Sequence, residues 1–357
     1  MSELSTSSLH EPERELPPIL PEWAAAHSLH YQLLANQQIM LEDVHRTSKY
    51  HSGIQENATD FRGKTVLDVG AGTGILSLFA ARAGAKKVYA VEGTAAAEYA
   101  RQLIEHAGVS DRVEVLRGRL DQITLDTKVD VIISEPWGFF LFHERMIEVF
   151  LQARDRFLVP GGKLFPSAAR LCIAPFCDDA FYQWRNERLD FWERKDYFGV
   201  DLTAIADAAR RELYEMPAVG LVDPASLSAE PAALSMNLYD TALNDLACVR
   251  FPFRFTVNRS GLIHGLAGWF DVMFGGSDKI VTLSTAPDMP PTHWAQIRFL
   301  FPSPIELEAG AVMEGRLILT ANAQSSYDVM VELASAPNGS TKQQRYRLQA
   351  YFPWQNV

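Results

Sequence analysis

The chain has few cysteines, a shortage of basic residues and no long apolar run, and each shortage excludes a class of protein. Its three cysteines, Cys172, Cys177 and Cys248, are not spaced as metal ligands and cannot all pair, which predicts free thiols, a reducing compartment and no bound metal. Lysine and arginine number 33 against 44 aspartates and glutamates, so the net charge of −11 disfavours direct nucleic-acid binding and suits basic polypeptides. No apolar run approaches ~18 residues and the N-terminus lacks a signal-peptide core, so we expect no membrane contact and a cytoplasmic or nuclear location.

What the chain does have is two regions with different patterning. Its 357 residues, 47% hydrophobic and 22% charged, suffice for one large or two modest globular domains. Residues 1–22 are rich in Ser, Glu and Pro, which predicts a disordered tail. Residues 23–165 contain a helical stretch and then short apolar strands alternating with helices, which predicts a parallel sheet covered on both faces. The predicted strands are Thr65–Val69, Lys87–Glu92, Arg112–Leu116 and Val129–Glu135, and the predicted helices are Gly74–Ala83, Ala95–Ala107 and His143–Leu158.

After a predicted turn at 159–162, residues 166–357 follow a different pattern. Long strand-like runs predict an antiparallel β domain, either a sandwich or a barrel. An aromatic-rich insert at about 176–199 either packs on this domain or forms an exposed interaction arm, and the pattern alone does not decide between the two. The predicted strands are Val249–Val257, Leu262–Phe274, Lys279–Ala286, His293–Phe301, Met313–Ala321 and Tyr327–Ala334.

Three glycines, Gly70, Gly72 and Gly74, stand where the first predicted strand turns into the first helix. Glycine at such a turn lets the backbone approach a ligand closely. The spacing G-x-G-x-G differs from the G-x-G-x-x-G of dinucleotide sites, so a pyrophosphate is not the expected ligand.

Acidic residues surround this glycine loop at the ends of predicted strands. Asp68 precedes the glycines and suits a cationic amino group, while Glu92 ends the second strand, where an acid takes ribose hydroxyls. Asp121 follows the third strand, just after Gly118, and could accept from an adenine amino group. An adenosine with a ribose and an amino-acid tail, but no phosphate, is S-adenosylmethionine, which is therefore the predicted cofactor.

Two glutamates, Glu135 and Glu144, bracket a nearly uncharged aromatic loop that follows the apolar run Val129–Ile133. Two acids in such apolar surroundings are costly unless a cation lies between them. A guanidinium suits that gap, because its planar, forked donors can be held by two carboxylates at once. A cofactor loop together with this pair of acids predicts chemistry on arginine.

With these motifs in view, the chain resembles the protein arginine methyltransferases, and most of all their coactivator-associated class. The likeness runs from about residue 28 to the C-terminus and rests on the glycine loop, the paired glutamates and Thr292-His293-Trp294. The motifs that favour the coactivator-associated class are Ser134-Glu135-Pro136, Glu144-Arg145-Met146, Gly261-Leu262-Ile263-His264-Gly265-Leu266, Trp269-Phe270-Asp271 and Ser284-Thr285-Ala286-Pro287.

The resemblance implies a fold and partners. The fold is an N-terminal helix and a Rossmann-like methyltransferase domain over 23–165, then an antiparallel β-barrel over 166–357 that carries a helical dimerisation arm at about 176–199. It implies a homodimer, in which each arm docks on the partner's Rossmann-like domain. The implied substrates are arginine-containing proteins such as histones and RNA-binding or Arg-Gly-rich proteins.

The resemblance also assigns roles to side chains. Glu135 and Glu144 would hold the substrate guanidinium, and Asp43 would pair with His293 across the domain interface. Either a glutamate of the pair or the Asp43–His293 dyad would accept the proton released by methylation. The remaining implied contacts are Tyr31 and Trp294 for the substrate, and Gln37, Met40, Arg46 (at the carboxylate), Asp68, Gly70, Gly72, Gly74, Glu92, Gly118, Asp121 and Met146 for the cofactor.

The sequence departs from the family at two places. Its N-terminal helix reads His27, Ser28 and Tyr31 where relatives carry Tyr-Phe-x-x-Tyr, which concerns how that helix closes over the cofactor. Trp137 and Phe139 stand in the glutamate loop where relatives often have Met and Tyr.

Three functions are compatible with these observations. The first is an arginine methyltransferase that makes monomethyl and then asymmetric dimethyl products, which Met40 on the N-terminal helix favours. The second is an enzyme of the same family that stops at monomethylarginine or makes the symmetric product. The third is a catalytically silent subunit that binds and activates a partner methyltransferase, which the eroded helix motif favours.

Overall fold

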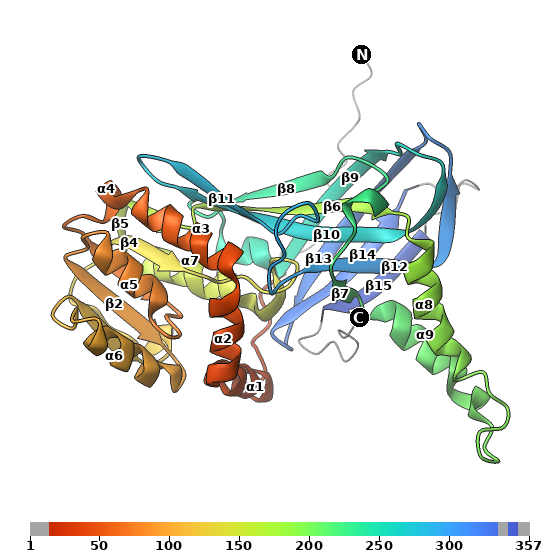
Figure 1. Ribbon diagram of the computed structural model, residues 1–357, viewed down its shortest axis with the longest axis horizontal. Coiled ribbons are helices and arrows are strands. Elements are labelled where there is room, and N and C mark those ends of the chain that lie inside the picture. The colour runs from red at the N-terminus through yellow and green to blue at the C-terminus, as the bar shows by residue number, and fades with distance from the viewer. Residues whose placement is uncertain (1–13, 335–341, 349–357) are drawn as a thin grey trace.

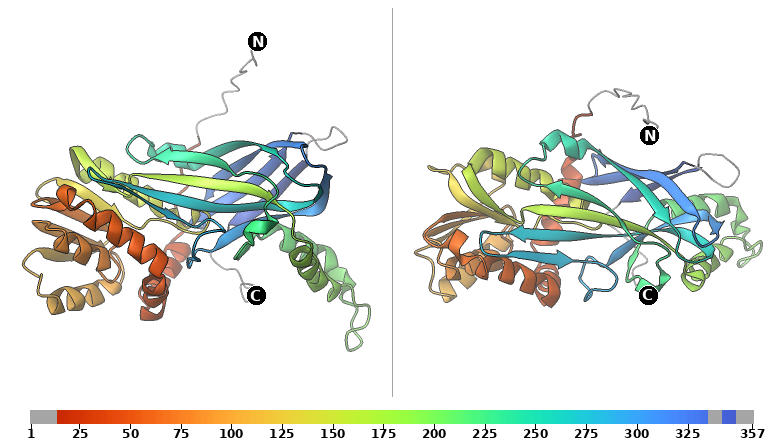
Figure 2. Two further views of the ribbon diagram at one scale, coloured as in Figure 1. Left: turned by 45° about the horizontal axis from the view of Figure 1, so that its top comes forward. Right: turned by 90° about the horizontal axis from the view of Figure 1, so that it is seen from above.

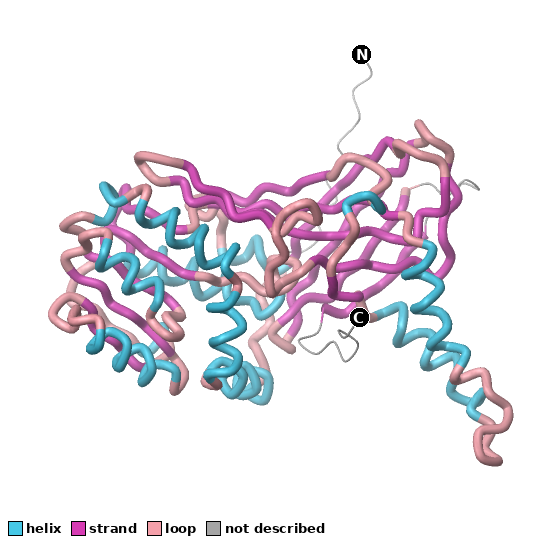
Figure 3. Tube along the Cα trace, in the orientation of Figure 1, coloured by secondary structure: helices cyan, strands magenta, loops and turns pink. Residues whose placement is uncertain are grey.

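The computed structural model describes residues 14–334 and 342–348 and has two parts with a projecting helical arm (Figure 1). The first part ends with β5 (Leu158–Phe165), and the second begins with β6 (Ala168–Phe176). Figure 3 shows the change from alternating helices and strands in the first part to mostly strands in the second. The predicted fold class, a Rossmann-like sheet followed by an antiparallel β domain, is confirmed.

Five parallel strands form the sheet of the first part, in the order β3-β2-β1-β4-β5. Crossover connections are right-handed, so α5 and α6, which step from β1 through β2 to β3, cover one face. Helix α7, which steps from β4 to β5 in the opposite direction, covers the other face (Figure 1). The bounds are β1 Thr65–Val69, α5 Ile75–Arg82, β2 Lys87–Glu92, α6 Ala96–His106, β3 Val113–Arg117, η1 Leu120–Gln122, β4 Val129–Ser134, η2 His143–Arg145 and α7 Met146–Phe157.

The start of α7 differs from the prediction. The helix expected to begin at His143 begins at Met146. Glu144 and Arg145 have φ angles of 72° and 58°, a left-handed conformation that an α-helix of L-residues does not sustain. The second glutamate therefore lies in a strained turn before the helix.

Two further boundaries are corrected in the strands. Residues 159–162, predicted to be a turn, bulge from β5, since Leu158 and Lys163 pair with β4 on either side of them. The strand expected from His293 begins at Gln296, because Ala295 has a φ of 50° and the His293 N–H bonds to a side chain instead of a neighbouring strand.

The second part consists of two antiparallel sheets. The larger runs in the order β7-β12-β10-β6-β8, with β11 paired to β10, and the smaller runs β15-β14-β13-β9. Alternating burial along β9 and β14 shows that one face of each strand fills the core between the sheets. The remaining bounds are β7 Ala218–Gly220, η4 Pro224–Ser226, β8 Ala232–Asn237, η5 Leu243–Ala247, β9 Cys248–Thr256, β10 Gly261–Gly275, β11 Ile280–Ser284, β12 Gln296–Leu307, β13 Val312–Asn322, β14 Ser326–Leu333 and β15 Lys342–Leu348.

A hairpin from the second part holds the first part in place. Strands β10 and β11 extend beyond the barrel and lie against α3 (Val44–Gln55), as Figure 2 shows from two sides. The turn of this hairpin is bonded to the region around α4 (Ala58–Phe61): Asn57 Oδ1 accepts from the backbone N–H of Lys279, and Asp60 accepts from Ser277. The cleft between the two parts is therefore bridged by specific bonds.

The aromatic insert projects from the barrel as the arm seen in Figure 1. It consists of α8 (Asp179–Asp190), a loop, η3 (Leu202–Ile205) and α9 (Ala206–Glu215), so it extends beyond the predicted end at residue 199. Phe176, placed at its start by the sequence prediction, is instead fully buried in β6. At the tip, the Phe198 side chain is 93% exposed.

The N-terminal segment crosses from the barrel to the parallel sheet. Residues 14–20 precede α1 (Pro21–Tyr31) and α2 (Leu34–Glu42), and the Leu20 N–H donates to the Ala323 carbonyl at 2.9 Å. The predicted disordered tail is thus corrected for residues 14–22, which contact the barrel; residues 1–13 lie outside the described residues. Among the described helices, none is long and apolar enough to span a membrane.

Candidate functional site

A cavity of about 490 Å³ lies where the carboxyl ends of the parallel strands meet α1, α2 and α3. The strand order reverses between β1 and β4, and ligands of open α/β sheets bind at such a switch point. The volume lies within the range of small-molecule sites, about 300–1,000 Å³. The residues predicted for the site that line the cavity are Tyr31, Gln37, Met40, Arg46, Gly70, Gly72, Glu92, Gly118, Asp121, Glu135, Glu144 and Met146.

Five predicted residues do not line the cavity. Gly74 is the left-handed N-cap of α5, with a φ of 79°, and faces Ala100 of α6. It therefore shapes the loop from behind. The other four are Asp43, Asp68, His293 and Trp294, which support the cavity wall as described below.

Three N–H groups of the glycine loop are bonded within the protein. The N–H groups of Gly70 and Ala71 donate to the Val91 carbonyl at 2.9 and 3.0 Å. The Gly72 N–H donates to Glu92 Oε2 at 2.8 Å. A pyrophosphate needs such donors pointed at the ligand, so this loop is not a phosphate cradle.

Close packing explains why Gly72 is glycine. Its φ is +54°, and a Cβ atom placed there would lie 2.8 Å from Gln37 Oε1. Gln37 is itself buried and donates to the Tyr31 carbonyl at 2.7 Å, which ties α1 and α2 to the loop. The cradle is therefore lined by backbone and is roofed by the N-terminal helices.

Asp68 lies behind the loop and not at its edge. Its carboxylate is fully buried, and Oδ2 accepts from the Ser77 hydroxyl at 2.6 Å. Burial raises the pKa of Asp68 to about 7. The placement at the rim predicted from sequence is thus corrected, because the side chain of a residue inside β1 points into the layer beneath α5.

Glu92 and Asp121 line the cavity on the β2–β3 side of β1, whereas the glutamate loop follows β4 on the other side of β1. Glu92 is buried and accepts from two backbone groups, the N–H of Gly72 and the N–H of Thr94. The Asp121 side chain is 62% exposed and pairs with Arg119 at 3.3 Å. The first carboxylate is fixed in orientation, whereas the second is at the mouth of the site.

The first glutamate of the loop is paired with an arginine. Arg46 Nε donates to Glu135 Oε1 at 2.8 Å, and Nη1 donates to the Met40 carbonyl at 3.2 Å. Burial raises the pKa of Glu135, with the Arg46 charge acting against it. An arginine stays protonated in proteins, so Glu135 presents a carboxylate with one oxygen engaged.

The second glutamate is held by α1. The Tyr31 hydroxyl donates to Glu144 Oε2 at 2.7 Å, and His27 Nε2 lies 3.5 Å from the same oxygen. Although burial opposes it, His27 and the other neighbours lower the pKa of Glu144. Two carboxylates from opposite sides of one loop thus face the cavity, each with a protein donor already on one side.

The loop between the glutamates is strained and braced. Phe140 and Leu141 have φ angles of 52° and 70°, unusual for such residues. The Phe140 ring fills the space over Gly268, where a Cβ atom would lie 2.2 Å from it. A non-glycine residue at 268 would push the loop out of place. The strain is therefore sustained by barrel residues shaped to receive the loop.

Trp294, predicted to bind substrate, supports this loop from below. It is 4% exposed, and its Nε1–H donates to the Trp137 carbonyl at 3.0 Å. Trp137 in turn donates to the Tyr50 hydroxyl at 3.1 Å. These bonds hold the glutamate loop in position. The substrate contact predicted for Trp294 is therefore corrected.

The structure brings Asp43 and His293 together as predicted. The Asp43 Oδ2 atom lies 2.8 Å from His293 Nδ1 and accepts from the His293 N–H at 2.8 Å. Oδ1 caps α3 by accepting from the Arg46 N–H at 2.9 Å. Burial opposes ionisation, but these bonds outweigh it and lower the pKa of Asp43. The pair joins the barrel to α3 beside Arg46.

Sequence analysis missed two supports of Glu144. Its carbonyl accepts from the Ser325 hydroxyl at 3.0 Å, and the neighbouring Arg145 donates to Glu148 and to the Asn322 carbonyl. It also treated His27 only as a departure from the family. His27 stands four residues before Tyr31, a spacing that puts both on one helical face.

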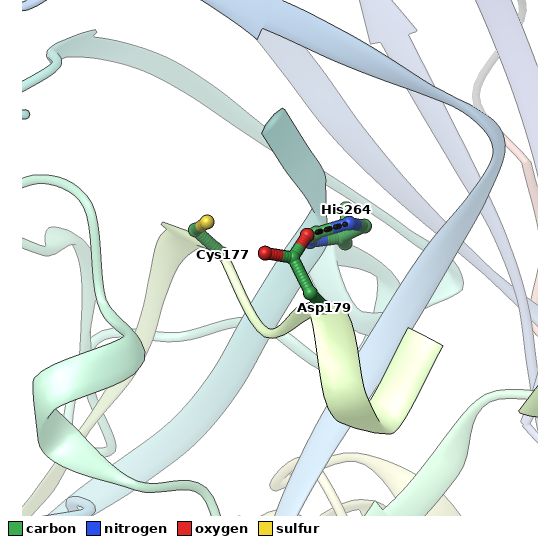
Figure 4. A group of neighbouring side chains, drawn as sticks. All are labelled: Cys177, Asp179 and His264. Atoms are coloured by element: carbon green, nitrogen blue, oxygen red, sulfur yellow. Dashed lines mark ion pairs between the residues drawn. The ribbon is translucent and has the colours of Figure 1, made fainter. Parts of the chain in front are cut away.

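Outside the cavity, the described residues bring Cys177, Asp179 and His264 together at the base of the arm, with ligand atoms within 4.8 Å of one another (Figure 4). His264 Nδ1 accepts from the backbone N–H of Asp178 at 3.0 Å, so the ring proton lies on Nε2, 3.3 Å from Asp179. A metal on Nε2 would require a proton on Nδ1, facing another donor. The group is therefore arranged as a contact between His264 and the Asp179 carboxylate and does not suit a metal.

Comparisons with known proteins identify methyltransferases as relatives of this chain. The arginine methyltransferase oligomerization subdomain matches residues 167–338, and a methyltransferase domain matches residues 66–162. The histone-arginine methyltransferase CARMER of Drosophila grimshawi is 44% identical over 303 residues, which are 85% of this chain and 56% of that protein. CARMER of Drosophila persimilis gives the same identity with 57% of its length. The chain thus spans little more than half the length of these curated relatives.

Two solved structures share the whole architecture. Arabidopsis thaliana protein arginine methyltransferase 10, described in a uniquely open conformation, superimposes with a TM-score of 0.82 at 31% identity, covering 89% of this chain and 99% of that one. The Trypanosoma brucei PRMT1 enzyme–prozyme heterotetrameric complex with AdoHcy gives 0.82 at 32% identity, with the same coverage.

Proposed function

This chain belongs to the protein arginine methyltransferase family, and we propose that it transfers methyl groups from S-adenosylmethionine to guanidino nitrogens of protein arginines. The observation that carries the proposal is the pair of largely shielded carboxylates, Glu135 and Glu144, in the wall of the cavity that the glycine loop also lines. Each carboxylate has one protein donor and faces the same cavity. Such a pair suits a planar cation that has hydrogen-bond donors on two edges.

The cavity fits S-adenosylmethionine, which when bound supplies an electrophilic methyl group on a sulfonium. A loop in which the N–H groups of Gly70, Ala71 and Gly72 are bonded within the protein suits a ligand without phosphates. Glu92 would hold the ribose hydroxyls, and Gly118 and Asp121 would hold the adenine. Arg46, a buried cation in the opposite wall, would hold the amino-acid carboxylate.

The glutamate pair would do two things to a bound arginine. A protonated guanidinium is a poor nucleophile, because its charge is delocalised over three nitrogens. Glu135 and Glu144 would draw that charge toward the clamped nitrogens through bonds of about 1.5–3 kcal/mol each. The remaining terminal nitrogen would then face the methyl group, and this alignment supplies much of the acceleration.

The product we propose is monomethylarginine followed by asymmetric dimethylarginine. Met40 lines the cavity next to Arg46, and an unbranched side chain there leaves room for a second methyl on the same nitrogen. A monomethylating or symmetric-dimethylating enzyme is the second candidate. The third is a silent partner subunit; against it, Tyr31 of the eroded helix motif still reaches Glu144 at 2.7 Å.

We propose a homodimer as the active assembly. The part of the chain that matches the family's oligomerisation subdomain includes the arm, whose tip exposes Phe198 and, at 36%, Tyr197. Exposed aromatic side chains on a projecting segment are typical of an interface. The apolar residues Leu29 on α1 and Leu33 and Leu34 at the start of α2 are exposed and would be covered by a partner.

The proposed substrates are basic, arginine-containing proteins: histones, RNA-binding proteins or Arg-Gly-rich proteins, met in the nucleus or cytoplasm. The net charge of −11 favours such ligands, and the curated relatives are named histone-arginine methyltransferases.

The experiment is label transfer from S-adenosylmethionine to an Arg-Gly-rich peptide, with a matched peptide in which lysine replaces every arginine. We expect label on the arginine peptide alone, recovered as asymmetric dimethylarginine after hydrolysis. Equal labelling of both peptides would refute the substrate. If this chain alone transfers no label but increases the activity of an added methyltransferase, the chain is a silent subunit instead.

A further inference from the structure

A histidine lies in direct contact with the proposed catalytic carboxylate. His27 Nε2 is 3.5 Å from Glu144 Oε2, and both side chains belong to the cavity wall. The Nε2 atom is shielded from solvent yet has no hydrogen-bond partner among the described residues. A shielded nitrogen whose neighbour is a carboxylate of the proposed clamp is placed to exchange a proton with that carboxylate.

We propose that His27 takes up the proton that arginine loses on methylation, acting through Glu144. This rests on the proposed function. It assigns the proton to the position on the N-terminal helix where this chain departs from the family's Tyr-Phe-x-x-Tyr motif. Neither a glutamate of the pair nor the Asp43–His293 dyad is then its final acceptor. His27 thus acts on the reaction only through Glu144 and does not bind the methyl donor.

The competing acceptors are less suited by their contacts. Glu135 is engaged by Arg46 Nε at 2.8 Å, and Asp43 accepts from three donors, two of them on His293 or its backbone. His293 does not line the cavity. Glu144 accepts from Tyr31 and holds its charge well, so it passes a proton on more readily than it keeps one.

The groups around His27 are otherwise engaged, which leaves its ring, beside Glu144, as the remaining proton acceptor. On its own helix, the Tyr31 ring lies 4.6 Å away and its hydroxyl serves Glu144. From η2, Glu144 faces it directly, whereas His143 is turned to Ser326 at 2.8 Å, and burial lowers the His143 pKa. Across the cavity stand Glu135 and Arg46, which neutralise each other.

The step balances in atoms and charge. A terminal guanidino nitrogen forms a bond to the methyl carbon as the sulfur–carbon bond breaks and its electron pair remains on sulfur. The methylated nitrogen gives up its proton along the bond to Glu144, and the proton comes to rest on His27 Nε2. The positive charge lost by sulfur is thereby transferred to the imidazole, which forms an ion pair with Glu144.

The test is the pH dependence of kcat for the wild type, His27→Gln and His27→Tyr. Glutamine keeps a polar group without a titration, and tyrosine restores the family's residue. We expect the wild-type kcat to depend on pH through an ionisation that requires His27. In both variants that ionisation should vanish, and kcat should fall by about 10-fold or more.

His30→Gln is the matched control, because His30 is an exposed histidine three residues further along the same helix. Its profile should equal that of the wild type. A second readout needs no turnover: calorimetry of arginine peptide binding with S-adenosylhomocysteine, in two buffers of different ionisation enthalpy. A guanidinium arriving at Glu144 should expel a proton from His27 in the wild type and none in His27→Gln.

The proposal is overturned if His27→Gln keeps the wild-type ionisation, or if it releases the same number of protons on peptide binding. Failure of the proposed function would give a different result, because the wild type would then transfer no methyl group at any pH. In that case the assignment of His27 as proton acceptor falls with it.

Discussion

Replacing Glu144 by glutamine keeps the shape of the side chain and removes its charge, so it isolates the electrostatic part of the proposed clamp. The Glu144 side chain is 19% exposed, and Oε2 accepts from Tyr31 at 2.7 Å. A charge so shielded from water interacts strongly with a nearby cation. Removing one preorganised group at a reacting centre costs about 3–4 kcal/mol, so kcat should fall by roughly 10²–10³.

Glu135→Gln is the informative comparison, because Glu135 has a second task. It accepts from Arg46 Nε at 2.8 Å, and Arg46 is the residue proposed to hold the carboxylate of the methyl donor. Glu135→Gln should therefore weaken cofactor binding as well as lower kcat. Glu144→Gln should lower kcat and leave cofactor binding unchanged.

Label transfer at saturating peptide, together with calorimetric titration of S-adenosylhomocysteine, separates the two effects. Thermal unfolding of each variant checks that the fold is kept. Retention of more than about a tenth of the wild-type kcat in both variants would refute the clamp, since it corresponds to less than about 1.4 kcal/mol.

The remaining predictions concern the cofactor end, the link between the two parts and the arm. Glu92→Ala should weaken S-adenosylhomocysteine binding by about 10-fold or more in calorimetry, since backbone and ribose donors lose a charged acceptor, whereas Glu98→Ala on exposed α6 should not. The bonds to Asp43 lower its pKa despite burial, so its carboxylate adds stability above about pH 4 that is lost as the pH falls through its folded-state pKa. The unfolding free energies of the wild type and Asp43→Asn should therefore differ at pH 7 and converge as the pH falls below about 4, and a constant difference would contradict this. Phe198→Asp should shift the protein toward the monomer in light scattering, and an unchanged mass would mean that the arm tip is not at the interface.

Local patterns sufficed to predict the features that depend on short stretches of sequence. The ends of the strands that carry Glu92 and precede Glu135 could be placed, because a buried strand has a continuous apolar run bounded by polar residues. The glycine loop could be placed because its three glycines directly follow the first such strand. The resemblance then supplied the pairing of Asp43 with His293, which are 250 residues apart and whose contact no local pattern encodes.

The positions that could not be predicted are those that the tertiary structure imposes. The side chain of Asp68 points toward Ser77 on α5 and not into the cavity. The distance in sequence between Asp68 and the glycines does not reveal this direction. Trp294 was expected at the substrate, but its direction depends on Trp137 approaching from the other domain. The left-handed backbone at Glu144 is sustained by barrel contacts such as that from Ser325.

The most direct test of the account is a crystal structure of the protein with S-adenosylhomocysteine and an arginine-containing peptide. We expect the guanidinium between the carboxylates of Glu135 and Glu144, with one terminal nitrogen directed at the sulfur and Arg46 on the cofactor carboxylate. A guanidinium bound elsewhere, with either glutamate turned away from it, would contradict the central claim.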